Sequence, residues 1–166
     1  MCEIRREKFK RDNANKTLMK LPLILSQARF QDKILPDLKE DCFYISILDP
    51  DDLGSLSPDT ENFKTFKFWD IEEDISSYKC FNFEQAREMY QFIKANYGKQ
   101  LIVHCHAGVS RSSAVGEFYF EMQGGSYKQL TEAYKNIMPN GRVLSYLRIA
   151  EKEDTTVYDF KINFTQ

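Results

Sequence analysis

The chain has 166 residues, the length of one compact domain. Hydrophobic residues make up 42% of it and charged residues 29%, so a buried core is expected and a disordered chain is excluded. The formal net charge is −2 and the sequence pI is near 5.8, which argues against a nucleic-acid-binding protein. No apolar run approaches the roughly 20 residues of a membrane span, and no secretory signal is recognisable, so we expect a cytoplasmic protein.

Hydrophobic periodicity predicts alternating strands and helices. Short runs rich in β-forming residues predict strands at residues 21–25, 43–48, 63–68 and 100–104. Apolar residues three and four apart predict helices at residues 28–38, 83–97, 110–123, 127–137 and 143–152. Residues 155–166 are expected to form an edge strand or a tail. This order of elements predicts an α/β domain over residues 21–154, with a mostly parallel sheet flanked by helices.

The charges are distributed unevenly along the chain. Residues 1–20 contain seven Lys or Arg and three acidic residues, whereas residues 36–74 contain twelve acidic residues and three Lys. The first segment is predicted to be a basic N-terminal arm, either simply solvated or used for interaction. The chain has four cysteines, Cys2, Cys42, Cys80 and Cys105. Their spacing fits neither a disulfide framework nor a structural zinc site, so we expect reduced thiols.

The segment Leu101–Ser113, LIVHCHAGVSRSS, joins a predicted buried strand to a predicted helix. Cys105 and Arg111 are six residues apart, and the residues between them can curl so that their backbone N–H groups point at one centre. Such a nest binds anions, and the following helix adds the positive end of its dipole. Arg111 can hold two phosphoryl oxygens with its planar guanidinium, and Gly108 permits a backbone conformation that other residues resist. The loop is therefore predicted to bind phosphate.

The same electrostatic field favours the thiolate form of Cys105, which is the nucleophilic form. Ser112 could donate a hydrogen bond to the sulfur and help it leave when a covalent intermediate breaks down. By average residue usage, the combined pattern of residues 104–112 arises by chance on the order of once in tens of thousands of chains of this length. We therefore interpret Cys105 as a nucleophile rather than as a small structural side chain.

Residues 104–112, HCHAGVSRS, resemble the phosphate-binding signature of the cysteine-dependent protein tyrosine phosphatases, and the small dual-specificity-like members fit best. The resemblance implies hydrolysis of phosphoesters through a cysteinyl-phosphate, with no metal or cofactor. It also implies that Cys105 is the nucleophile, that Ser112 assists departure of the thiolate, and that His104 orients and tunes the cysteine. The phosphate-binding residues that it implies are His106, Ala107, Gly108, Val109, Ser110 and Arg111.

The implied mechanism needs an acid to protonate the leaving oxygen. The family carries this acid, an Asp, on a loop upstream of the nucleophile, and residues 68–71, Phe-Trp-Asp-Ile, resemble that loop. Asp70 is therefore the expected acid, although the proline that larger relatives carry in this loop is absent. Three further acidic residues compete for the role, namely Glu72, Glu73 and Asp74, and an acidic turn without a catalytic role also stays open. Asn140 lies where relatives use a Pro-Asn turn to brace the phosphate loop.

The expected function is hydrolysis of phosphotyrosine in proteins or peptides, with phosphoserine and phosphothreonine left open as substrates. The chain is too short for the phosphotyrosine-recognition loop of the larger relatives, which favours a shallower pocket. A non-protein phosphoester, either a phosphoinositide or an RNA 5′ phosphate, is one alternative, and a non-catalytic phosphopeptide-binding module is another. The absence of Lys from residues 106–110 counts against a phosphoinositide. Cys42 or Cys80 could trap an oxidised Cys105 as a disulfide.

Overall fold

The computed structural model describes residues 19–163, with side chains described up to residue 155. The predicted basic arm, residues 1–20, lies outside the described residues except for its last two positions. Within the described part of the chain, no helix is both long enough and apolar enough to cross a lipid bilayer.

A parallel sheet of four strands forms the centre of residues 19–163, and its spatial order is β1-β4-β2-β3. The strands are β1 (Leu23–Ser26), β2 (Cys42–Leu48), β3 (Phe63–Lys67) and β4 (Gln100–Cys105). The helices are α2 (Gln27–Lys33), α3 (Phe83–Ala95), α4 (Arg111–Met122), α5 (Tyr127–Ala133) and α6 (Gly141–Asn163). The predicted α/β class, with a parallel sheet flanked by helices, is confirmed.

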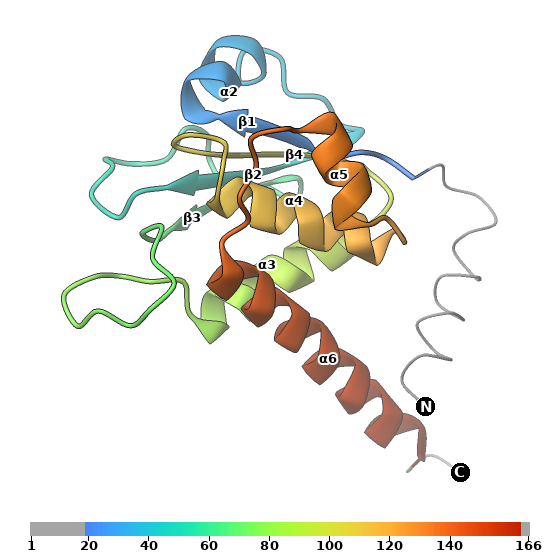
Figure 1. The fold of residues 1–166 in the computed structure, drawn as a ribbon. Coiled ribbons are helices and arrows are strands. Elements are labelled where there is room, and N and C mark those ends of the chain that lie inside the picture. Colours follow the sequence, from blue (N-terminus) through green and yellow to red (C-terminus); the bar gives the residue numbers. More distant parts are fainter. Residues whose placement is uncertain (1–18, 164–166) are drawn as a thin grey trace.

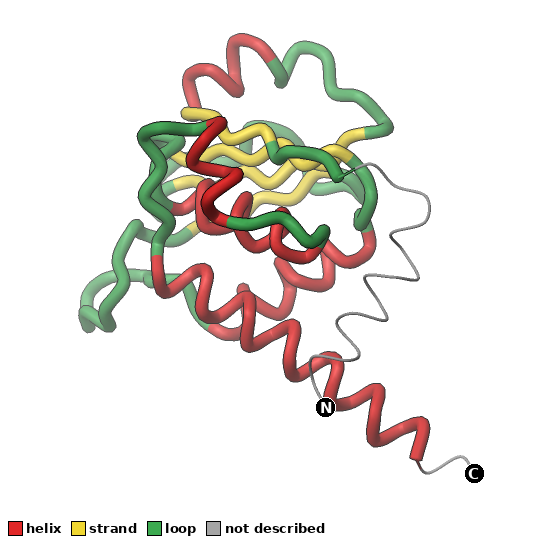
Figure 2. Tube along the Cα trace, turned by 45° about the vertical axis from the view of Figure 1, so that its right-hand side comes forward, coloured by secondary structure: helices red, strands yellow, loops and turns green. Residues whose placement is uncertain are grey.

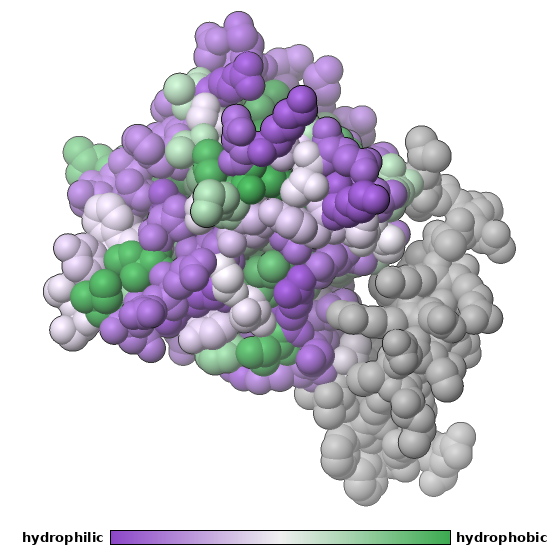
Figure 3. All heavy atoms as spheres, in the orientation of Figure 1, coloured by the Kyte–Doolittle hydropathy of each residue, from purple (hydrophilic) through white to green (hydrophobic). Residues whose placement is uncertain are grey.

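Helices cover both faces of the sheet (Figures 1 and 2). On one face, Phe30 of α2 packs in a small cluster with the strand residues Tyr44, Phe63 and Ile102. The other four helices lie on the opposite face and form the larger core with alternate strand residues such as Val103. Because β4 is covered on both faces, the middle of its sequence, Leu101–Val103, is a continuous apolar run rather than an alternating pattern. The surface in Figure 3 is mostly hydrophilic, with hydrophobic residues in small separate patches.

Parallel pairing brings the carboxyl ends of the strands to one edge of the sheet. The loops that follow β2, β3 and β4 all begin at this edge, where Ser46 of β2 pairs with His104 of β4. In Figure 1 the loops after β2 and β3 project together from the left side of the molecule. This edge therefore gathers segments that are far apart in the sequence.

Two helices and the C-terminal segment differ from the prediction. The helix predicted at residues 127–137 ends at Ala133, where the backbone of Tyr134 becomes extended, and further on Met138 N–H donates to Val109 O of the phosphate loop at 2.9 Å instead of continuing a helix. The helix predicted at residues 28–38 ends at Lys33, shortly before Pro36. The edge strand expected for residues 155–166 is wrong for the described part, because α6 continues to Asn163. After Gly141 no Gly or Pro interrupts this helix, and each further residue adds a backbone hydrogen bond.

Candidate active site

The phosphate loop, residues 105–111, runs from the end of β4 to the start of α4 and packs tightly against β1. Gly108 has φ +74°, and a Cβ at this position would lie 2.6 Å from the backbone C of Leu25 and from the backbone N of Ser26. Next to it, Gln27 N–H donates to His106 O at 3.2 Å. Glycine is required at position 108 both by the left-handed backbone and by the close approach of the neighbouring strand.

The outer side of the phosphate loop is also held by hydrogen bonds. Val109 O accepts from Met138 N–H at 2.9 Å and also from the Ser113 hydroxyl. Ser110 O accepts from Asn140 N–H at 3.2 Å. With these carbonyl oxygens bonded outwards, the backbone N–H groups are left to face the interior of the loop, as an anion-binding nest requires.

The Cys105 side chain is 2% exposed, and its sulfur lies 3.2 Å from the Ser112 hydroxyl oxygen. Burial by itself raises the pKa of this thiol. The hydrogen bond from the Ser112 side chain, together with those from the backbone N–H groups of Ser112, Gly108 and Val109, outweighs burial and lowers the pKa below the ordinary thiol value. The thiolate is thus favoured in the interior of the phosphate loop.

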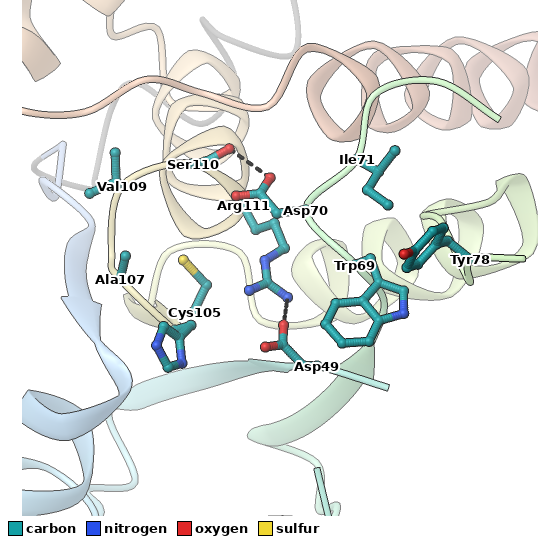
Figure 4. A pocket seen from close by; sticks show the side chains of 11 residues that line it. Asp49, Trp69, Asp70, Ile71, Tyr78, Cys105, Ala107, Val109, Ser110 and Arg111 are labelled. Atoms are coloured by element: carbon teal, nitrogen blue, oxygen red, sulfur yellow. Dashed lines mark hydrogen bonds and ion pairs between the residues drawn. The ribbon is translucent and has the colours of Figure 1, made fainter. Parts of the chain in front are cut away.

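The Arg111 side chain is buried beside the Cys105 sulfur (Figure 4). Its Nη1 donates to the Asp49 carboxylate at 2.7 Å and to the Phe68 carbonyl at 2.8 Å. Its Nε is buried and has no hydrogen-bond partner among the described residues. The guanidinium is thus oriented by one nitrogen, while another donor stays free for a ligand in the pocket.

The sequence analysis did not identify Asp49 as a site residue. It directly follows β2 at the carboxyl edge of the sheet, next to the strand that carries the cysteine. An acidic residue directly after a buried strand was the signal available in the sequence. Its pairing with Arg111 depends on the strand order, which residue spacing alone does not determine.

The acidic loop, residues 69–80, connects β3 to α3 and forms one wall of the site. In this loop Asp70 Oδ1 accepts two hydrogen bonds, from the Ser110 hydroxyl at 2.8 Å and from the Asn140 side-chain amide at 2.8 Å. Its other carboxylate oxygen, Oδ2, has no hydrogen-bond partner within residues 19–155. Asp70 is thereby held over the phosphate loop with one oxygen fixed and one free (Figure 4).

The other acidic candidates point away from the pocket. Glu72 Oε1 accepts from Gly141 N–H at 2.7 Å, and Asp74 Oδ1 pairs with Arg142 Nη2 at 2.7 Å. Both contacts are with the start of α6, and Glu72, Glu73 and Asp74 are all absent from the pocket lining. Asp70 is the one of the four acidic candidates whose side chain the structure brings to the pocket.

His104 lies on the opposite side of the sheet from the cysteine, because successive side chains of a strand alternate. Its ring stacks on Phe30 at 4.4 Å between centroids, and its Nε2 lies 2.8 Å from the hydroxyl oxygen of Ser46, a residue that the sequence analysis did not single out. Burial, helped by the positive charge of Arg111 and opposed by the backbone of Cys105, lowers the pKa of His104 to about 4. A neutral histidine thus supports β4 from behind and does not line the pocket.

The pocket above the phosphate loop has a volume of about 520 Å³ (Figure 4). Its lining comprises Asp49, Trp69, Asp70, Ile71, Tyr78, Cys105, His106, Ala107, Val109, Ser110 and Arg111. One wall is apolar, because the Trp69 and Tyr78 rings meet edge to face at 6.1 Å beside Ile71. Cys42 and Cys80 are buried outside this lining, and the Cys80 thiol contacts the Glu73 carbonyl instead.

The sequence matches no protein-family model and no curated protein. The side chains of the described residues include no group of three or more His, Cys, Asp or Glu that could hold a metal ion.

Proposed function

We propose that the protein is a phosphatase that hydrolyses phosphotyrosine in proteins or peptides through a cysteinyl-phosphate intermediate. One observation carries this proposal: a cysteine with a lowered pKa and an arginine with an unpartnered buried Nε lie side by side in one pocket. A dianionic phosphate monoester would supply acceptors for the guanidinium and for the loop N–H groups. The likeness of residues 104–112 to the signature of the cysteine-dependent protein tyrosine phosphatases supports the same conclusion.

In the first step, the Cys105 thiolate attacks phosphorus and forms the S–P bond. The ester P–O bond breaks, and its electron pair goes to the leaving oxygen. Asp70 donates its proton to that oxygen, so the product leaves as a neutral alcohol or phenol. Arg111 and the loop N–H groups stabilise the charge on the transferring phosphoryl oxygens.

In the second step, the Asp70 carboxylate removes a proton from a water molecule, and the water oxygen attacks phosphorus. The S–P bond breaks, and its electron pair returns to sulfur. The Ser112 hydroxyl donates a hydrogen bond to the departing thiolate, which lowers the energy of that charge. Inorganic phosphate leaves, and Asp70 is protonated again for the next cycle.

The apolar wall of the pocket supports an aromatic phosphoester as the preferred substrate. Trp69, Ile71 and Tyr78 stand beside the phosphate loop, where the ring of a bound phosphotyrosine would contact them. A phosphoserine would leave this wall uncovered, and we expect its hydrolysis to be slower.

The proposal is tested by hydrolysis of 4-nitrophenyl phosphate near pH 6 in the presence of a chelator. We expect the wild-type protein to release nitrophenol and Cys105→Ser to release none, because the hydroxyl of serine is far less acidic than the thiol and is a poor nucleophile here. Activity that persists in Cys105→Ser would contradict the cysteine mechanism. A folded wild-type protein without activity that still binds a phosphotyrosine peptide would instead support the phosphopeptide-binding module.

A further inference from the structure

The start of α6 contacts the acidic loop at three consecutive residues. The Asn140 side-chain amide donates to Asp70, the Gly141 N–H donates to Glu72, and the Arg142 guanidinium pairs with Asp74, all at 2.7 to 2.8 Å. The carboxylates at positions 70, 72 and 74 thus each have a partner in one short segment. The acidic loop is fastened to α6 on the side next to the pocket.

Arg142 makes the widest set of contacts in this segment. Besides Asp74, its Nε donates to the Phe81 carbonyl at 2.7 Å and its Nη1 lies 3.5 Å from the Glu72 carbonyl oxygen. The guanidinium carbon lies 4.9 Å from the centre of the Tyr146 ring. Glu72 lies near the start of the acidic loop and Phe81 directly follows its end. The Arg142 side chain therefore contacts the chain at both ends of the loop.

The Arg142 side chain is 10% exposed, whereas that of Asp74 is 85% exposed. An isolated exposed ion pair contributes little, so the bond to Phe81 and the packing on Tyr146 hold Arg142 in place. The ring of Tyr146 is itself stacked on Phe83 at 4.1 Å, at the beginning of α3. Arg142 therefore has a fixed position from which it can hold the loop.

We propose that Arg142 is a positioning residue that keeps Asp70 over the phosphate loop, a role that rests on the phosphatase function proposed above. Arg142 does not line the pocket. It acts two and four residues along the chain from Asp70, through the Glu72 carbonyl and the Asp74 carboxylate. Without it, the acidic loop would lose its contacts at Asp74 and Phe81 and would be held near its start by the Asn140 and Ser110 contacts of Asp70 and by the Gly141 contact of Glu72. Glu72 and Asp74, which the sequence left open as acids, serve in this arrangement as the anchors of the loop.

The test compares Arg142→Met with Arg87→Met. Methionine keeps most of the apolar length of the arginine side chain. Arg87 is a suitable control because two of its nitrogens also pair with α6, at 2.9 Å to Glu153, whereas neither of these contacts involves the acidic loop. Each variant is assayed on 4-nitrophenyl phosphate, whose leaving group departs readily without a proton, and on phenyl phosphate, whose leaving group needs one.

We expect Arg142→Met to lose about tenfold in kcat on phenyl phosphate and no more than about twofold on 4-nitrophenyl phosphate, because misplacing the acid forfeits only part of its catalytic contribution. Arg87→Met should lose neither activity. An equal loss on both substrates in Arg142→Met would overturn the positioning role, since general damage to the fold does not depend on the leaving group.

A second variant and a second readout keep the proposal testable if Arg142→Met folds poorly. The variant Asp74→Ala removes the exposed carboxylate that pairs with Arg142 and leaves α6 unchanged, and it should show the same split between the substrates. Trp69, the only tryptophan of the chain, reports the acidic loop without any turnover. Its fluorescence should be quenched more readily by acrylamide in both loop variants than in Arg87→Met. If the wild-type protein hydrolyses neither substrate, the phosphatase proposal fails, and unchanged quenching would separately overturn the role of Arg142.

Discussion

His104 and His106 stand two positions apart and have opposite environments. His104 is fully buried against Phe30 and Ser46, whereas His106 is exposed at the rim of the pocket. The pKa of His104 is lowered to about 4, mainly because burial penalises the charged ring. The lowered pKa of His104 therefore contributes to the pH dependence of the stability of the protein.

The sign of this dependence follows from proton binding. Between about pH 6.5 and pH 4, His104 takes up a proton in the unfolded chain and not in the folded one. Its contribution to stability is therefore complete above the unfolded pKa and is lost as the pH falls. From pH 7.5 to pH 5.5 we expect the free energy of unfolding to fall by about 1.4 kcal/mol through this group.

Urea unfolding at the two pH values measures this change. His104→Gln should remove this component of about 1.4 kcal/mol, while the matched variant His106→Gln should keep it, because it leaves the buried His104 in place. The same pH dependence in both variants would show that another group is responsible.

At the residue scale, the contacts within the motif of residues 104–112 could be predicted from the sequence, whereas its contacts with distant residues could not. The spacing from Cys105 to Ser112 was enough to predict that their side chains meet, because a strand, a tight loop and a helix leave few other arrangements. Asp49 and Ser46 approach Arg111 and His104 from about sixty residues upstream. Such contacts depend on strand order and register, which are set by the packing of the whole sheet.

At the scale of elements, the phosphate loop and β1 fit together only with glycine at position 108. Gly108→Ala should destabilise the protein by more than the roughly 1 to 2 kcal/mol that a left-handed backbone costs an L-residue, since the new Cβ also overlaps the backbone of Leu25 and Ser26. Displacement of the loop should also abolish phosphatase activity.

Gly124→Ala separates the cost of a left-handed backbone from the cost of overlap between the new Cβ and its neighbours. Gly124 has φ +94°, but a Cβ there would meet nothing within 4 Å. We expect this variant to lose only the backbone contribution in thermal unfolding and to keep full activity on 4-nitrophenyl phosphate. If Gly108→Ala proved no less stable and no less active than Gly124→Ala, the tight packing of the phosphate loop against β1 would be wrong.

Element boundaries were the least predictable part of the fold. The apolar spacing of residues 127–137 suits a helix throughout, yet the chain leaves the helix after Ala133 and runs past the phosphate loop. Conversely, the alternating pattern near residue 160 suggested a strand, and the helix simply continues through it. In the first case a hydrogen bond to the distant Val109 is available only in the folded chain, and in the second the local helical hydrogen bonds outweigh the alternating pattern.

At the scale of the whole molecule, the parallel sheet explains why one site draws on so many segments. The alternation of strands and helices predicted this class of fold, and the carboxyl edge of the sheet is where such folds place their ligands. The meeting of the acidic loop with the start of α6 was not predicted, because the hydrogen bond between Asp70 and Asn140 forms only once α3, α4 and α6 pack on the same face of the sheet (Figure 2). Because these contacts hold Glu72 and Asp74 against the start of α6, Asp70 is the one carboxylate of the acidic loop that lines the pocket.

The central claim is that phosphate is transferred to Cys105, and Ser112→Ala provides the most direct measurement. This variant keeps Arg111 and Asp70 but removes the hydroxyl that stabilises the departing thiolate. The protein is mixed with 4-nitrophenyl phosphate, quenched with acid within the first turnovers, and analysed by intact mass and peptide mapping. We predict a burst of nitrophenol and one phosphoryl group on Cys105, absent from a Cys105→Ser sample treated in the same way. Steady release of phosphate with no phosphoryl group on Cys105 at any time would contradict the account.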